Sequence, residues 1–116
     1  MEFSHVLHLL GALVTLGLGG LGLFRPLAAA RLIGLEPKGR LGLSELRATY
    51  GGLFAVLGAF ALVTRDEVAF TLLGAAWLGA AAARTFDALL VKGADRPIWR
   101  AALFEAGVAL LLLAPV

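Results

Sequence analysis

The ionisable side chains within the apolar stretches of this sequence are few, and they gather near one end of those stretches. Six of them lie within or at the ends of the last three stretches: Glu45, Arg47, Tyr50, Arg84, Asp87 and Glu105. A charged side chain in hydrocarbon is costly, so it usually faces the interior of a helix bundle and has a partner there. Arginines in such a place can hold phosphate or carbonyl oxygens, and carboxylates can hold the arginines in position. These residue types predict a ligand-binding site for the polar head of a lipophilic molecule.

The rise of an α-helix places three of these residues at one depth. Tyr50, Arg84 and Glu105 each lie seven residues from the same end of their predicted spans, which corresponds to about 10 Å. Arg47 and Asp87 lie about one turn nearer that end. We therefore predict that Glu105 pairs with Arg84 between two helices, and that the Tyr50 hydroxyl completes the network.

The elements that must carry these residues are apolar helices. The chain has 116 residues, 60% of them hydrophobic, no Asn and no Gln, and a mean hydropathy of +0.93. A soluble domain of this size needs a more polar surface. Four stretches have about the 20 residues needed to cross a bilayer: residues 6–24, 43–63, 68–91 and 98–114. We expect an all-α fold, a single transmembrane domain over residues 1–116 that forms an integral membrane four-helix bundle.

Polar and turn-forming residues separate the four predicted spans. Arg25-Pro26 ends the first span, and a short segment over residues 27–35 follows it. Glu36-Pro37-Lys38-Gly39-Arg40 is the clearest loop, and Arg65-Asp66-Glu67 ends the second span. The stretch from Lys92 to Pro97 predicts a turn, with the proline at the first position of the last helix.

Basic residues are distributed unevenly between the two sides of the predicted bundle. With four spans, both termini lie on the same side, and the first and third loops lie on the other. The loop side carries Arg25, Arg31, Lys38, Arg40, Lys92, Arg96 and Arg100, against Arg65 alone on the terminal side. Positive charge near short loops stays in the cytoplasm. We therefore expect the charged cluster in the cytoplasmic leaflet and both termini outside.

Glycine and alanine are spaced within the spans in a way that is typical of helix packing in membranes. Residues 17–22 match the dinucleotide fingerprint G-x-G-x-x-G, but that motif requires a preceding strand and an exposed helix start. We favour helix packing there. Further predicted seams are Ala48/Gly52, Gly51/Ala55 and Ala75/Gly79/Ala83. Whether these seams lie within one bundle or between protomers stays open.

A metal site is not expected in this chain. There is no cysteine, which excludes thiolate ligands and disulfides. His5 and His8 have a spacing that could hold a metal, but the other candidate ligands on that side are few. We favour an interfacial histidine pair that contacts headgroups. Trp99, at the start of the last span, fits the role of an interfacial aromatic residue.

The segment that opens the second span also carries a recognisable motif. Glu45-Leu46-Arg47-Ala48-Thr49-Tyr50-Gly51-Gly52 resembles the E-x-R-x-x-Y-G-G pattern of a bacterial membrane family catalogued as domain of unknown function 4345. Arg84 late in the third span and Glu105 early in the fourth are also similar to that family's pattern. The resemblance implies a four-helix protein of the bacterial inner membrane, similar in general shape to DoxX-like proteins. It implies no particular activity.

Three functions are compatible with these observations. The favoured one is a module that binds a lipid- or quinone-type molecule through the charged cluster. The second is an accessory subunit of a membrane complex or homo-oligomer, in which the charges only fix helix register. The third, catalysis on a lipophilic substrate, is least favoured, because no nucleophile or cofactor motif stands out. The expected partners are membrane lipid, a lipophilic small molecule or another membrane protein. With a net charge of only +2, we expect no nucleic acid.

Overall fold

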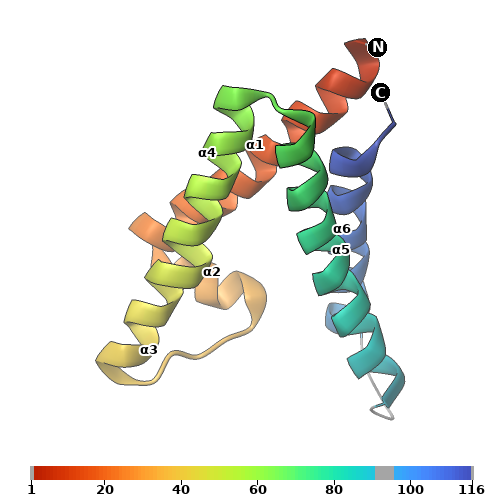
Figure 1. The fold of residues 1–116 in the computed structure, drawn as a ribbon. Helices are drawn as coiled ribbons and strands as arrows, with labels where there is room; N and C mark the ends of the chain where they lie inside the picture. Colours follow the sequence, from red (N-terminus) through yellow and green to blue (C-terminus); the bar gives the residue numbers. More distant parts are fainter. Residues whose placement is uncertain (1, 91–95, 116) are drawn as a thin grey trace. The chain divides into compact units, whose positions relative to one another are not determined.

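The computed structural model describes residues 2–90 and 96–115, and this part of the chain is helical (Figure 1). No strand occurs among these residues. The elements are α1 Glu2–Phe24, α2 Pro26–Ile33, α3 Gly39–Glu45, η1 Leu46–Leu53, α4 Phe54–Thr64, α5 Glu67–Leu90 and α6 Arg96–Leu113. The segments α3, η1 and α4 follow one another without a break, so they form one long helix, Gly39–Thr64. The predicted all-α class is confirmed.

Three of these helices are long and apolar enough to cross a membrane: Phe3–Phe24, Gly39–Thr64 and Glu67–Leu90. They coincide with the first three predicted spans. The fourth predicted span, residues 98–114, is helix α6, but three of its residues are charged: Arg96, Arg100 and Glu105. Because α6 has only 18 residues, it has no stretch as long and as poor in charge as those in the other three helices, so the four-span count stays a prediction.

The helix ends follow the predicted breaks, with one correction. Pro26 is at the start of α2, and Gly34 closes that helix in the left-handed conformation, φ 76°, which glycine adopts without strain. The predicted loop through Arg40 is too long, because α3 already begins at Gly39. Asp66 caps α5 by accepting a hydrogen bond from the Val68 backbone N–H at 3.0 Å.

The predicted turn before α6 is covered only in part. Lys92, Gly93, Ala94 and Asp95 lie outside the described residues, as does Val91 at the end of the third predicted span. Pro97 lies in the first turn of α6, where its missing N–H costs no helical hydrogen bond.

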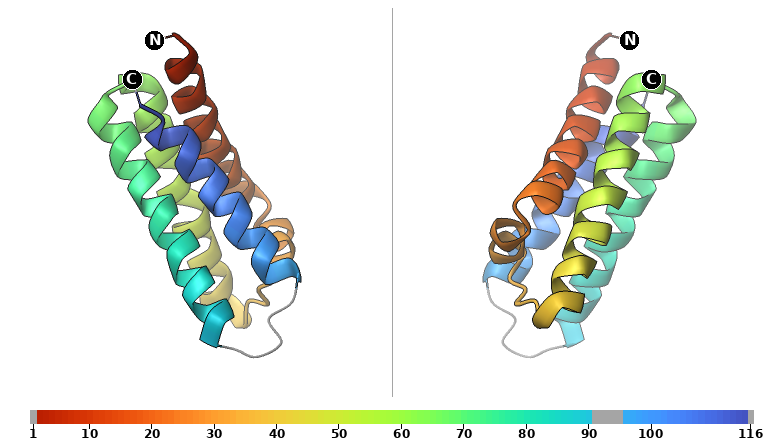
Figure 2. Two further views of the ribbon diagram at one scale, coloured as in Figure 1. Left: turned by 90° about the vertical axis from the view of Figure 1, so that its right-hand side faces the viewer. Right: turned by 90° about the vertical axis from the view of Figure 1, so that its left-hand side faces the viewer.

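The contacts divide the chain into two units, and α1 contributes to both. The first unit comprises the described residues of Met1–Gly11 and Asp66–Val116, and the second comprises Ala12–Arg65. In the first unit, α5 and α6 lie side by side (Figure 2). Gly74 lets them approach closely, since a Cβ there would be 2.7 Å from Cγ of Leu113. Phe70 and Leu112 are fully buried.

In the second unit, glycines bring α1 against η1 and α4. A Cβ on Gly19 would collide with the backbone of Ala55, and one on Gly22 would collide with the Tyr50 carbonyl. A Cβ on Gly58 would be 2.5 Å from the Leu16 nitrogen. Contact at this range needs glycine, because any side chain would push the two backbones apart. Gly19 and Gly22 of the fingerprint-like segment therefore serve helix packing, as predicted, whereas a Cβ on Gly17 would meet nothing within 4 Å.

The other predicted seams differ in outcome. Gly51 packs against Leu23, so the Gly51/Ala55 seam is confirmed. A Cβ on Gly79 would meet nothing within 4 Å, and the flanking Ala75 and Ala83 are exposed. The Ala75/Gly79/Ala83 seam is therefore not used within the first unit. The Ala48/Gly52 seam is likewise open, since a Cβ on Gly52 would have only the Arg47 oxygen within 4 Å, at 3.8 Å.

Candidate functional site

The central feature of the candidate site is an ion pair between Arg84 of α5 and Glu105 of α6. Arg84 Nε donates to Glu105 Oε1 at 2.8 Å, and Arg84 Nη2 donates to Oε2 at 2.7 Å. This two-pronged geometry fits a planar guanidinium to a planar carboxylate, and it is among the strongest hydrogen-bonding arrangements in proteins. The predicted pairing of these two residues is confirmed.

The two partners differ in how far their side chains are exposed. The Glu105 side chain is 11% exposed, whereas the Arg84 side chain is 39% exposed. Around Glu105, α6 buries the apolar residues Ala102, Val108 and Ala109. A lone carboxylate in such surroundings would be costly, so Glu105 needs the guanidinium as a partner. The arginine is thus fixed by a buried acid while much of its side chain stays accessible.

Of the other four predicted site residues, one lies in the same unit as this pair and three lie in the second unit. Asp87 lies on α5 and is exposed. Glu45 ends α3, and Arg47 and Tyr50 lie in η1, so these three belong to the second unit. Glu45 and Arg47 are exposed, and Tyr50 is half-buried, with its ring 6.0 Å from that of Phe54. The structure therefore brings together Arg84 and Glu105, and the role of the Tyr50 hydroxyl stays a prediction.

The motif-bearing segment has a backbone conformation that sequence reasoning missed. Leu46–Leu53 is a π-helix, with hydrogen bonds from each residue to the fifth along the chain. Such segments are rare in proteins overall, but those that occur are frequently found at functional sites. Within it, Leu46 and Gly51 are buried, and Arg47 is exposed. The one hint in the sequence is the Gly51-Gly52 pair, which weakens the preference for an α-helix.

The family of this chain is shown by a match along nearly its whole length. A family model described as a domain of unknown function (DUF4345) matches residues 3–115. The chain belongs to this family. No curated protein and no solved structure matches the DUF4345 chain.

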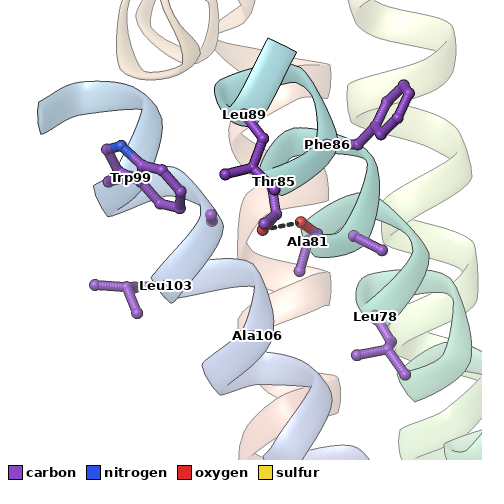
Figure 3. A pocket seen from close by; sticks show the side chains of 10 residues that line it. Leu78, Ala81, Thr85, Phe86, Leu89, Trp99, Leu103 and Ala106 are labelled. Carbon is purple, nitrogen blue, oxygen red and sulfur yellow. Dashed lines mark hydrogen bonds between the residues drawn. The ribbon is translucent and has the colours of Figure 1, made fainter. Parts of the chain in front are cut away.

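This DUF4345 protein also has an apolar groove between α5 and α6, with a volume of about 530 Å³ (Figure 3). Its walls are Leu78, Ala81, Ala82, Thr85, Phe86, Leu89, Trp99, Ala102, Leu103 and Ala106. The Thr85 hydroxyl is engaged within α5, since it donates to the Ala81 carbonyl at 2.8 Å. None of the six predicted site residues lines this groove. The groove and the ion pair are therefore separate features of the α5–α6 pair.

The histidines of the DUF4345 chain correct one prediction. His8 is only 3% exposed, so it does not contact headgroups as an interfacial residue would. Its Nε2 lies 2.8 Å from the Ala114 carbonyl oxygen, and its ring centroid lies 5.0 Å from that of Phe70. The His8 Nδ1 is buried without a hydrogen-bond partner. Among the described residues no group of three or more metal-binding side chains exists.

Proposed function

We propose that this protein is an integral membrane protein that binds the polar head of a lipophilic molecule, of lipid or quinone type, at Arg84. The observation that carries the proposal is the contrast within the ion pair. Glu105 is buried and takes two hydrogen bonds from Arg84, while 39% of the Arg84 side chain stays exposed. An arginine held in this way is already ordered before a ligand binds.

The physical reason lies in the cost of ordering a long side chain. A free arginine loses rotamer freedom when it binds a ligand, and this loss weakens binding. Arg84 has already lost that freedom to Glu105. Its positive charge and planar shape suit phosphate or carbonyl oxygens, and attraction is stronger in a region of low dielectric constant than in water.

The proposal includes the topology inferred from the sequence. It has four spans in the bacterial inner membrane, with both termini outside and Arg84 in the cytoplasmic leaflet. Its full ligand-binding set adds Glu45, Arg47, Tyr50 and Asp87 to the ion pair. Arg47 and Tyr50 lie in η1 of the second unit, so their contribution is tested by variants of their own.

Mass spectrometry of the protein extracted in its own lipids tests the proposal. We expect one small molecule, bound stoichiometrically to the wild type and lost from Arg84→Ala. Arg84→Lys keeps a positive charge opposite Glu105 but not the paired hydrogen bonds, and we expect it to weaken retention while preserving the fold. Arg31→Ala removes an exposed arginine of α2 and is the matched control, which should retain the molecule.

Variants Arg47→Ala and Tyr50→Phe extend the same experiment to η1. Loss of the same molecule from these variants would support the full ligand-binding set. Retention in both would confine the site to the first unit. Equal amounts of bulk lipid in the wild type, Arg84→Ala and Arg84→Lys, with no specific small molecule, would overturn the proposal.

A second candidate function is supported by a different observation. The small residues Ala75, Gly79 and Ala83 lie on α5 without a partner helix in the described part of the first unit. Such stripes let helices pack closely in membranes, so this face suits an accessory subunit or a homo-oligomer, with Arg84 and Glu105 acting only to fix helix register. In that case Gly79→Leu should dissociate a copurifying protein or oligomer, and Arg84→Lys should not.

A further inference from the structure

We infer that the groove between α5 and α6 binds one acyl chain of an anionic phospholipid, whose headgroup is held by Arg96 and Arg100. This site uses neither Arg84 nor Glu105, so it does not rest on the function proposed above. The groove belongs to the first unit alone, because its lining residues lie between Leu78 and Leu89 on α5 and between Trp99 and Ala106 on α6.

The chemistry of the groove walls selects a hydrocarbon occupant. The lining side chains are alanine, leucine, phenylalanine, one tryptophan and Thr85. The Thr85 hydroxyl donates a hydrogen bond to the Ala81 carbonyl, so it needs no hydrogen-bond partner from a ligand. Because polar ligands lose hydration on entering such a site without gaining hydrogen bonds, the groove favours an apolar chain.

The length of the groove corresponds to one leaflet of a membrane. On α6 it extends from Trp99 to Ala106, and on α5 from Leu89 to Leu78. At 1.5 Å per residue these stretches are about 10 Å and about 16 Å long. Half of the hydrocarbon core of a bilayer is about 15 Å thick. A single acyl chain that starts near Trp99 therefore fits along the groove.

Positive charge is placed where the headgroup of that lipid would lie. Arg96 is three residues before Trp99 and seven before Leu103, so it shares a helix face with two residues of the groove wall. Arg100 is three residues before Leu103 and shares that face. Both arginines are exposed, and neither forms a salt bridge with another described residue. Two cations thus lie in the first two turns of α6, at the end of the groove that Trp99 lines.

The position of these arginines in α6 gives a second reason for an anion. The N-terminus of a helix carries a partial positive charge, so cations there are unfavourable and anions favourable. Within α6 itself, the first turn contains Arg96 and no acidic residue. A phosphate group bound at this point would relieve that repulsion.

The same charges argue against a second copy of the chain as the occupant. A two-fold symmetric dimer places the same patch of both copies in one interface. If the α5–α6 grooves faced each other in parallel copies, the arginine pairs would meet with like charge. An anionic lipid has the opposite charge and is therefore the favoured occupant.

Fluorescence quenching in lipid nanodiscs tests the inference, with Trp99 as the probe. The chain has one other tryptophan, Trp77, which is buried against Phe104. The variant Trp77→Phe leaves Trp99 as the single tryptophan. Dibrominated phosphatidylglycerol or dibrominated phosphatidylcholine is titrated into unbrominated phosphatidylcholine. We expect half-maximal quenching at a several-fold lower fraction of the anionic lipid. Arg96→Gln together with Arg100→Gln should move the anionic curve onto the zwitterionic one.

Filling the groove separates a bound chain from general contact with the bilayer. In the Trp77→Phe background, Ala106→Phe should abolish the saturable quenching, while Ala75→Leu on an exposed face of α5 should leave it unchanged. Arg84→Lys should also leave it unchanged, which distinguishes this site from the function proposed above. If the double arginine variant does not fold, the two single variants should each shift the curve part of the way.

Two results would overturn the inference. One is a pair of superimposable, unsaturated curves for the two brominated lipids, which would indicate bulk contact only. The other is a change of oligomeric state by cross-linking in Ala106→Phe with unchanged quenching curves, which would assign the groove to a second copy of the chain.

Discussion

Arg84 and Glu105 are joined by two hydrogen bonds of 2.8 and 2.7 Å, yet their side chains are exposed to different extents, 39% and 11%. The pair is therefore asymmetric. If Glu105 is removed, the long arginine side chain can extend toward a more polar region. If Arg84 is removed, the short acid remains buried among apolar residues of α6 without a partner.

This asymmetry gives a prediction for single and double variants of the pair. We expect Arg84→Ala to lower the free energy of unfolding by about 3 kcal/mol, because breaking a buried pair leaves an uncompensated charge. Glu105→Ala should cost about 1 to 2 kcal/mol, closer to the loss of a charged hydrogen bond. Unfolding in mixed micelles with increasing SDS measures both. The double variant should cost less than the sum by about 1 to 3 kcal/mol.

The exposed acid on the same helix is the matched control for the pair. Asp87→Ala removes a charge from α5 that is exposed, and it should change the free energy of unfolding by less than about 0.5 kcal/mol. Strict additivity of the two single variants would refute the coupling between Arg84 and Glu105.

Two adjacent glycines of α1 should respond in opposite ways to the same substitution. Gly19→Ala places a methyl group against the backbone of Ala55, whereas Gly20→Ala places it in open space. We expect the first to cost about 1 to 3 kcal/mol through overpacking, and the second to be neutral or to stabilise the helix by up to about 1 kcal/mol. Thermal unfolding followed by circular dichroism distinguishes them. Equal effects would mean that α1 does not pack on α4 through this face.

The two glycines of the family motif are predicted to divide in the same manner. A Cβ on Gly51 would be 2.8 Å from the Leu23 nitrogen, while on Gly52 it would meet only the Arg47 oxygen, at 3.8 Å. Gly51→Ala should therefore destabilise the second unit by about 1 to 3 kcal/mol. Gly52→Ala should be tolerated, and ligand retention in this variant should equal that of the wild type. A destabilised Gly52→Ala with a stable Gly51→Ala would contradict the packing of η1 on α1.

The features that the sequence predicted well are those set by hydrophobicity and helical rise. Charged residues in apolar helices are few, and the constant rise per residue fixes their depth. That is why the pairing of Arg84 with Glu105 could be predicted from two positions in antiparallel neighbours. The first three spans could be predicted because each is a long apolar run.

Other features depend on details that periodicity does not encode. The π-helical geometry of Leu46–Leu53 involves a change in hydrogen-bond partner that has no strong residue signal beyond Gly51-Gly52. Which glycines face a neighbouring helix also depends on helix rotation, so the sequence identifies Gly79 as a small residue but does not show that it has no close neighbour within the first unit. The six-residue cluster as one site stays a prediction, because Arg47 and Tyr50 belong to the second unit.

The buried contact between His8 and the end of α6 supplies the last prediction. The Ala114 carbonyl follows the last residue of α6, where helix carbonyls lack intrahelical partners, and His8 Nε2 meets it at 2.8 Å. A carbonyl oxygen can only accept, so Nε2 donates this hydrogen bond, and the buried Nδ1 has no hydrogen-bond partner. His8→Phe keeps a ring beside Phe70 and loses only the hydrogen bond, so we expect a cost of about 1 kcal/mol. His8→Ala also leaves a cavity, and we expect a cost of about 2 to 4 kcal/mol.

The control is His5→Ala. His5 is half-buried, its ring centroid lies 6.5 Å from that of His8, and its substitution should have a small effect. Denaturation of the three variants in the same detergent measures the differences. If His8→Phe were as destabilised as His8→Ala, the hydrogen bond to Ala114, rather than ring packing, would hold the start of α1 to the end of α6.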